Sequence, residues 1–181
     1  MIFKGTRDDC SIIPFNEGHI HNTFAWVRET ELSHLFLIRG EVTWDKHLDY
    51  FNRVLHDRTQ HVYAIQVDNL HVGNCGLKNI SNLKKEGELW IYIGESSMRN
   101  KGIGKCAVYQ LLQIAFETLG LELIYLHIAD YNIGALKFYE KLGFIRIPLE
   151  NGDNEWSNRN CKIIKMELRK YKFEQMVSHN E

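Results

Sequence analysis

Residues 99–105 read Arg99-Asn100-Lys101-Gly102-Ile103-Gly104-Lys105. They join a segment typical of a strand, residues 88–93, to one typical of a long helix, residues 102–119. Glycines let a backbone approach a ligand closely, and the first turn of a helix presents unpaired N–H groups and the positive end of its dipole. Together with three basic side chains, this arrangement predicts a site for a phosphate or pyrophosphate. The alternative is a glycine-containing loop with solvated lysines.

Two familiar phosphate motifs are absent from this stretch. A Walker A loop needs GxxxxGK followed by Ser or Thr. A dinucleotide fingerprint needs GxGxxG, whereas Gly102-Ile103-Gly104 is followed by Lys105-Cys106-Ala107. ATP hydrolysis and hydride transfer are therefore disfavoured.

The periodicity of the remaining sequence predicts one α/β domain. Apolar residues recur at helical spacing in some segments and as short β-branched and aromatic runs in others. The elements are predicted as strand 11–15, helices 17–31 and 43–55, strands 61–67, 71–80 and 88–93, helix 102–119, strand 121–129, helix 132–143, and strands 144–149 and 161–168. Strand 121–129 is apolar on both faces, which is typical of a covered strand in a parallel sheet.

Composition places the chain among ordinary globular proteins. It has 181 residues, of which 44% are hydrophobic and 25% charged, so we expect one domain at 1–170 followed by a C-terminal tail at 171–181. A net charge of −1 disfavours nucleic acid as a partner. No apolar run approaches the about 20 residues that a membrane span needs, and no signal peptide is visible.

Cysteine and histidine usage indicates a cytoplasmic protein without a metal. The four cysteines, Cys10, Cys75, Cys106 and Cys161, are scattered singly, as expected of free thiols in a reducing compartment. His19-Ile20-His21 has no third and fourth ligand at useful spacing, so no metal site is expected.

Two blocks of the sequence, residues 99–104 and 132–144, are spaced like the motifs of one known family. The first reads Arg99-x-x-Gly102-x-Gly104, and the second reads Asn132-x-x-Ala135-x-x-Phe138-Tyr139-x-Lys141-x-Gly143-Phe144. They resemble the Q/R-x-x-G-x-G/A acetyl-CoA motif and the N-x-x-A-x-x-x-Y-x-K-x-G-F segment of the GNAT acetyltransferases. The neighbouring sequence looks most like the branch with ribosomal-protein N-terminal, polyamine and nucleotide-amino-sugar acetyltransferases.

The resemblance implies a fold and a set of acetyl-CoA contacts. The fold is a single α/β domain whose mixed, largely antiparallel central sheet contains a splayed pair of parallel strands, with helices on its flanks. Backbone amides of residues 99–105 would bind the pyrophosphate, and the strand edge would bind the pantetheine amides. The implied cofactor-binding residues are Ile91, Tyr92, Ile93, Arg99, Asn100, Lys101, Gly102, Ile103, Gly104, Lys105, Asn132, Ala135 and Phe138.

The chemistry of amine acetylation asks for a proton acceptor and a proton donor. An alkyl ammonium with a pKa of about 10.4 must lose a proton before it attacks a thioester. Glu88, next to the pantetheine strand, is the candidate base; the alternative is a surface glutamate paired with a lysine. Tyr139 matches the family tyrosine that protonates the leaving thiolate; the alternative is a core aromatic residue of its helix.

The leading hypothesis is an N-acetyltransferase that moves an acetyl group from acetyl-CoA to a primary amine by direct transfer in a ternary complex. The acceptor, an amino sugar, a polyamine, an antibiotic amine or a protein N-terminus, would be shaped by residues 16–60 and 150–160. The alternative function is a CoA-binding sensor or an inactive homologue. A final strand that pairs across subunits would give a homodimer, and the oligomeric state stays open.

Overall fold

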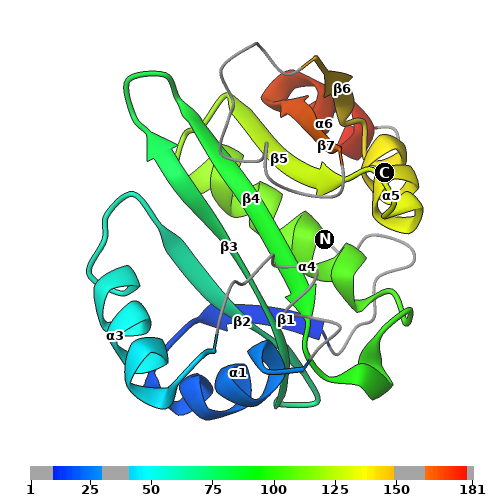
Figure 1. The fold of residues 1–181 in the computed structure, drawn as a ribbon. Coiled ribbons are helices and arrows are strands. Elements are labelled where there is room, and N and C mark those ends of the chain that lie inside the picture. Colours follow the sequence, from blue (N-terminus) through cyan, green and yellow to red (C-terminus); the bar gives the residue numbers. More distant parts are fainter. Residues whose placement is uncertain (1–9, 30–40, 149–161, 179–181) are drawn as a thin grey trace.

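The computed structural model describes residues 10–29, 41–148 and 162–178. In this part of the chain a seven-stranded sheet has the order β1-β2-β3-β4-β5-β7-β6 (Figure 1). Its strands are β1 (Cys10–Pro14), β2 (His61–Val67), β3 (Leu70–Ser81), β4 (Glu86–Ile93), β5 (Leu123–Ala129), β6 (Ile145–Ile147) and β7 (Ile163–Arg169). Neighbouring strands are antiparallel except for the parallel pair β4 and β5. The expected sheet is confirmed.

Helices cover both faces of the sheet. The helical segments are η1 (Glu17–His19), α1 (Ile20–Val27), α3 (Trp44–Val54), η2 (Ser96–Met98), α4 (Ile103–Gln113), the π-helical η3 (Ile114–Thr118), α5 (Ile133–Lys141) and α6 (Lys170–Ser178). On one face, Ala64 of β2 packs with Ile20 of α1 and Phe51 of α3. Its strand neighbour Ile65 points to the opposite face, into the larger core that contains α4.

Local turn and cap chemistry confirms several expected element boundaries. Asp68 and Asn69 join β2 to β3 with φ of 52° and 62°, as a two-residue hairpin turn requires. The Thr43 hydroxyl accepts a hydrogen bond from the Lys46 amide at the start of α3. At the start of α5, Asn132 Oδ1 accepts one from the Ala135 amide at 3.2 Å.

Some boundaries differ from the prediction. Residues 171–178, expected as part of a tail, belong to α6, where Phe173 is buried against Phe116 of η3. The predicted strand 144–149 shortens to β6, and residues 149–161 lie outside the described residues. No helix in the described ranges is long and apolar enough to cross a bilayer.

The parallel strands β4 and β5 pair only where they begin. The paired residues are Glu86 with Leu123, Gly87 with Ile124, and Glu88 with Tyr125. Beyond them β4 runs toward α1 and β5 toward α5, so the two strands separate (Figure 1). Residues 89–93 and 126–129 therefore have no parallel partner across this gap, which opens a V-shaped space through the sheet.

Candidate active site

A cleft of about 690 Å³ occupies the space between the separating strands. It is lined by β4, by β5, by the start of α5 and by the stretch that joins β4 to α4. The lining residues from these four parts include Glu88, Leu89, Trp90, Ile91, Tyr92, Ile93, Arg99, Asn100, Gly102, Gly104, Lys105, Leu126, His127, Asn132, Phe138 and Tyr139. The fold thus brings most of the site residues predicted from the sequence to one cavity.

The predicted phosphate-binding turn, residues 99–105, has the backbone shape that its glycines predict. Asn100 and Gly102 have φ of 60° and 81°, and Gly102 is the N-cap of α4. A Cβ built on Gly104 meets no atom within 4 Å, so the space beside this residue is open at the first turn of the helix. This arrangement of N–H groups and helix dipole suits an anion.

The side chains of Arg99, Lys101 and Ile103 have other positions than beside an anion in the cleft. The Arg99 guanidinium donates from Nε to the Ile93 carbonyl at 3.1 Å and from a terminal nitrogen to the Gly94 carbonyl at 3.0 Å. It therefore anchors the end of β4. Ile103 is buried in the core, and Lys101 is exposed outside the cleft lining.

The end of β4 is also held by α1. The indole of Trp26 is buried directly over Gly94, where any Cβ would collide with it. Glu29, just after α1, forms an ion pair with Arg99 at 3.2 Å. These contacts fix the direction in which β4 leaves β5 and so fix the width of the cleft.

Tyr139 lies on α5 with its ring packed between two aromatic rings. The ring centroids of Phe138 and Phe144 lie 4.9 Å and 5.3 Å from that of Tyr139. Burial raises the pKa of Tyr139, so its hydroxyl keeps its proton at neutral pH. A protonated phenol in the cleft wall has the chemistry of a proton donor. Ala135, by contrast, is absent from the lining and acts through its backbone amide in the Asn132 cap.

Glu88 is the third residue of β4 and is buried, with 6% of its surface exposed. Its Oε1 lies 3.0 Å from His127 Nδ1 and 3.4 Å from Lys78 Nζ, and its Oε2 accepts from Asn79 Nδ2 at 2.9 Å. Burial would raise the pKa of this carboxyl. The hydrogen bonds from His127 and Asn79 and the nearby positive charge outweigh burial and lower the pKa below its ordinary value of 4.5.

The lowered pKa of Glu88 gives an expected pH dependence of stability. An ionised Glu88 stabilises the fold at pH values above 4.5, and that contribution is lost as the pH falls through the lower folded-state pKa. We therefore expect Glu88→Gln to lower the free energy of unfolding at neutral pH, with a difference from wild type that shrinks in acid. Urea unfolding at a series of pH values measures this.

The matched control for this prediction is Glu86→Gln on the same strand, whose ion pair with Lys84 is more exposed. It should change stability less than Glu88→Gln at neutral pH, because exposed ion pairs contribute little. A Glu88→Gln difference that stays constant down to acid pH would contradict the assignment of ionisation to this carboxyl.

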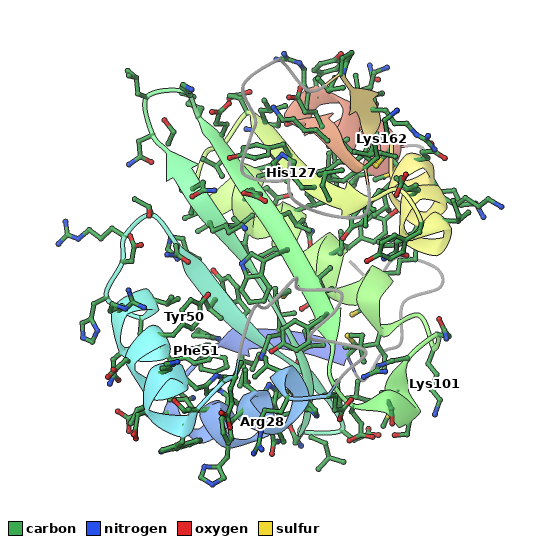
Figure 2. The ribbon with its side chains drawn as sticks, in the orientation of Figure 1. Arg28, Tyr50, Phe51, Lys101, His127 and Lys162 are labelled. Carbon is green, nitrogen blue, oxygen red and sulfur yellow. The ribbon has the colours of Figure 1, made fainter. Side chains whose placement is uncertain are left out.

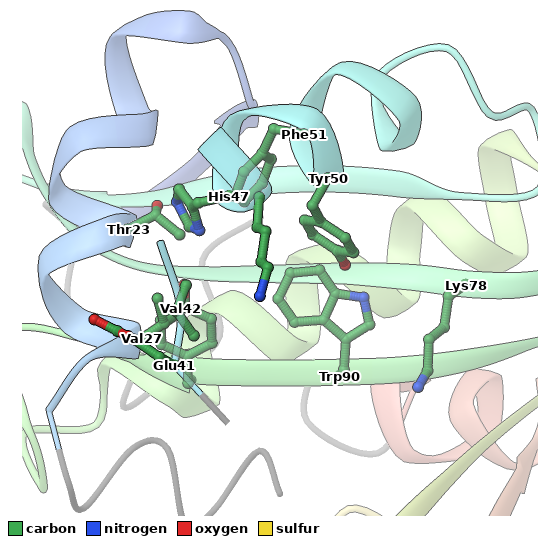
Figure 3. A pocket seen from close by; sticks show the side chains of 11 residues that line it. Thr23, Val27, Glu41, Val42, His47, Tyr50, Phe51, Lys78 and Trp90 are labelled. Atoms are coloured by element: carbon green, nitrogen blue, oxygen red, sulfur yellow. The ribbon is translucent and has the colours of Figure 1, made fainter. Parts of the chain in front are cut away.

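A second pocket, of about 470 Å³, lies under α1 and α3 on the opposite side of β4 from α4. Figure 3 shows Tyr50 and His47 of α3 and Trp90 of β4 pointing toward the same space. Lys78, Trp90 and Tyr92 line both this pocket and the cleft. The two cavities therefore adjoin along one face of β4.

The residues of α1 and α3 that form this pocket were not predicted individually as site residues. Thr23, His47 and Tyr50 lie far apart from Trp90 in sequence, and no local motif joins them. Only the range that contains Thr23, His47 and Tyr50, residues 16–60, was predicted to shape an acceptor site. Residues 150–160, expected to do the same, lie outside the described residues. His127 was also missed.

Comparison with known proteins identifies the family. The acetyltransferase (GNAT) domain matches residues 11–145. An N-acetyltransferase 9-like protein of Caenorhabditis briggsae is 24% identical over 167 residues, which are 84% of this chain and 82% of that protein. A spermidine N(1)-acetyltransferase of Vibrio cholerae is 28% identical over 105 residues, which are 57% of this chain and 60% of that protein.

The fold agrees with this family. The crystal structure of a Vibrio cholerae spermidine N-acetyltransferase in complex with CoA and spermine superposes with a TM-score of 0.82 at 19% identity, covering 92% of this chain and 99% of that one. The predicted enzyme class, an acyltransferase, is confirmed by the family and by the names of these relatives. The chain belongs to the GNAT family of acetyltransferases.

Proposed function

We propose that the protein transfers an acetyl group from acetyl-CoA directly to a primary amine while both substrates are bound. The observation that carries this proposal is the meeting of two cavities at Trp90 and Tyr92. One has a phosphate-binding turn at its mouth, and the other opens toward α1 and α3. Two substrates that enter from these two sides would meet at β4 without an acyl-enzyme intermediate.

The CoA moiety fits the cleft by its chemistry. Its pyrophosphate would lie on the amides of residues 100–105, where the α4 dipole favours negative charge. Its pantetheine amides would pair with the backbone of Ile91, Tyr92 and Ile93, beyond the last β4–β5 ladder pair. Asn132 and Phe138 would border the pantetheine from α5. A protein of the same fold was crystallised with CoA, which supports CoA as the ligand to test.

The reaction then needs two proton transfers. The amine, once deprotonated, attacks the thioester carbonyl carbon. The C–S bond of the tetrahedral intermediate breaks, and we assign Tyr139 as the donor of a proton to the sulfur. Glu88 belongs to the path that takes a proton from the amine. Its three donors and its place in the cleft support that role.

The acceptor pocket favours an amine with an apolar body. Its walls include Tyr50, Phe51 and Trp90, and the described charged residues at it are Glu41, Lys46 and Lys78. Spermidine is the first acceptor to test because one relative is named a spermidine N(1)-acetyltransferase. The mixed charges of the pocket keep amino sugars and protein N-termini as acceptors of equal standing. The cytoplasm, which supplies acetyl-CoA, is the proposed location. Its reducing conditions also suit the buried, free thiol of Cys75.

One assay tests the proposal. Purified protein is incubated with acetyl-CoA and, separately, spermidine, glucosamine 6-phosphate, an aminoglycoside or a short peptide with a free N-terminus, and thiol release is followed. We expect turnover with at least one acceptor and an acceptor mass increased by one acetyl group. Acetyl-CoA binding by calorimetry without turnover on any amine would favour the alternative, a CoA-binding sensor.

A further inference from the structure

We propose that His127 is the catalytic base that takes the proton from the acceptor amine and that Glu88 is a positioning residue that orients its imidazole. This assignment rests on the acetyltransfer proposed above. It gives a role to a histidine that no sequence motif identified, and it divides the work of proton removal between two strands.

The fold places the pair at the closed end of the cleft. The β4–β5 ladder ends at the pair Glu88 and Tyr125, and His127 is the next residue of β5 on the same face as Tyr125. Figure 2 marks His127 on β5, beside β4. The His127 and Glu88 side chains are 14% and 8% exposed, and both residues line the cleft. An acetyl group carried down the cleft would reach this closed end.

The environment of Glu88 determines which imidazole nitrogen carries hydrogen. An ionised carboxylate only accepts hydrogen bonds, and the lowered pKa of Glu88 keeps it ionised at neutral pH. The 3.0 Å contact therefore requires His127 Nδ1 to donate. In the neutral imidazole, Nε2 then holds the lone pair that can accept a proton. The same arrangement orients the histidine of hydrolase triads.

Glu88 itself is a poor base in this setting. Its two oxygens face the His127 Nδ1–H, the Asn79 amide and the Lys78 ammonium, all of which stabilise the charged form. A carboxylate held so firmly in its charged form takes up a proton only in acid. A neutral imidazole, by contrast, keeps a lone pair on one ring nitrogen, and histidine is the side chain that most often serves as a general base.

Every proton and every bond of the proposed acetyl transfer is accounted for. The acceptor enters as R–NH₃⁺ and gives one proton to His127 Nε2, and the resulting R–NH₂ forms the C–N bond with the thioester carbonyl. When the C–S bond breaks, the sulfur takes the Tyr139 proton, and the nitrogen returns a proton to Tyr139. His127 then releases its proton to water. The products are the acetamide, CoA thiol and one proton.

Charges from the packed elements surround this base. Lys78 of β3 and Glu88 of β4 lie on one side. On the other side, β7 places Lys165 opposite His127 in the ladder, with Lys165 Nζ 2.9 Å from Glu167 and 4.9 Å from the Tyr125 ring centroid.

The first test compares His127→Asn with Glu88→Gln, using the acceptor with the highest turnover in the panel. The Asn side chain can still donate an N–H to Glu88, but it has no basic nitrogen that could replace Nε2. We expect kcat to fall by about 10²–10⁴-fold at neutral pH with the KM for acetyl-CoA unchanged. The residual rate should rise with pH in proportion to the free amine. Glu88→Gln should lose less, because the imidazole of His127 remains in the cleft.

The control is Tyr125→Phe, which removes a hydroxyl from the neighbouring residue on the same face and should leave turnover unchanged. A Glu88→Gln protein far less active than His127→Asn would overturn the assignment in favour of Glu88 as the base. An active His127→Asn protein would remove only this assignment, whereas a wild-type protein without turnover would remove the proposed function as well.

The second test needs no acceptor and no active variant. Nitrogen-15 NMR of wild-type protein labelled at histidine reports which ring nitrogen carries hydrogen, and the His127 signals are assigned by their absence from His127→Asn or, if that variant does not fold, from His127→Gln. We expect the Nδ1–H tautomer. A neutral His127 in the Nε2–H form would overturn the proposal.

Discussion

Replacement of Tyr139 by Phe is expected to lower kcat by about 10²–10⁴-fold, the usual contribution of a positioned proton donor. The substitution keeps the ring packed against Phe138 and Phe144 and removes only the hydroxyl. Acetyl-CoA affinity, measured by calorimetry, should therefore stay the same. Acyl donors with a more acidic thiol should partly restore turnover, because their sulfur needs less protonation as it leaves.

The control for this substitution is Tyr109→Phe. The Tyr109 hydroxyl lies on α4 near Met176 Sδ, at 3.7 Å, and Tyr109 is not among the residues that line the cleft. Its loss should leave turnover unchanged. Full activity of Tyr139→Phe under conditions where the chemical step limits the rate would reject the role of the hydroxyl, although the enzyme class would stand.

The second large effect is expected on binding. Gly104→Val should weaken acetyl-CoA binding by about 1–3 kcal/mol, or ~5–150-fold, because its methyl groups would occupy the space that the pyrophosphate needs. The unliganded fold should tolerate the change, since a Cβ on Gly104 meets nothing within 4 Å. Calorimetry for affinity and thermal unfolding for stability separate the two quantities.

Gly134→Val is the matched control for Gly104→Val. Gly134 occupies the same position in the first turn of α5 as Gly104 does in α4, and a Cβ there also meets open space. It does not line the cleft, so its substitution should leave acetyl-CoA affinity unchanged. Equal affinities for both variants would place the pyrophosphate elsewhere.

Much of the cofactor side of the site was predictable because its determinants are local. The positive φ of Gly102, the cap at Asn132 and the glycine that follows α5 depend on residues within a few positions of one another. The role of Arg99 was not predictable. A guanidinium beside a phosphate turn suggests anion binding, but its contacts with the Ile93 and Gly94 carbonyls follow from the path of β4.

The acceptor side depended on contacts between distant segments. The pocket under α3 joins Tyr50 to Trp90 through the packing of α1 and α3 on the sheet. No periodic pattern specifies which apolar residue of a helix will face a cavity and which will face the core. For the same reason, residues 171–178 were predicted as part of a C-terminal tail, whereas they belong to α6, in which Phe173 is buried.

The sequence by itself determined the element order, the glycine turn at residues 99–105 and the helix that carries Tyr139, because backbone conformation at glycines and caps is set by near neighbours. Only the tertiary structure decided that Glu88 and His127, 39 residues apart, share a hydrogen bond. That contact exists because β4 and β5 are adjacent and parallel for three residue pairs and then separate. Strand pairing of this kind depends on residues far apart in the sequence. It produces the cleft, and it brings together the two side chains at the closed end of the cleft.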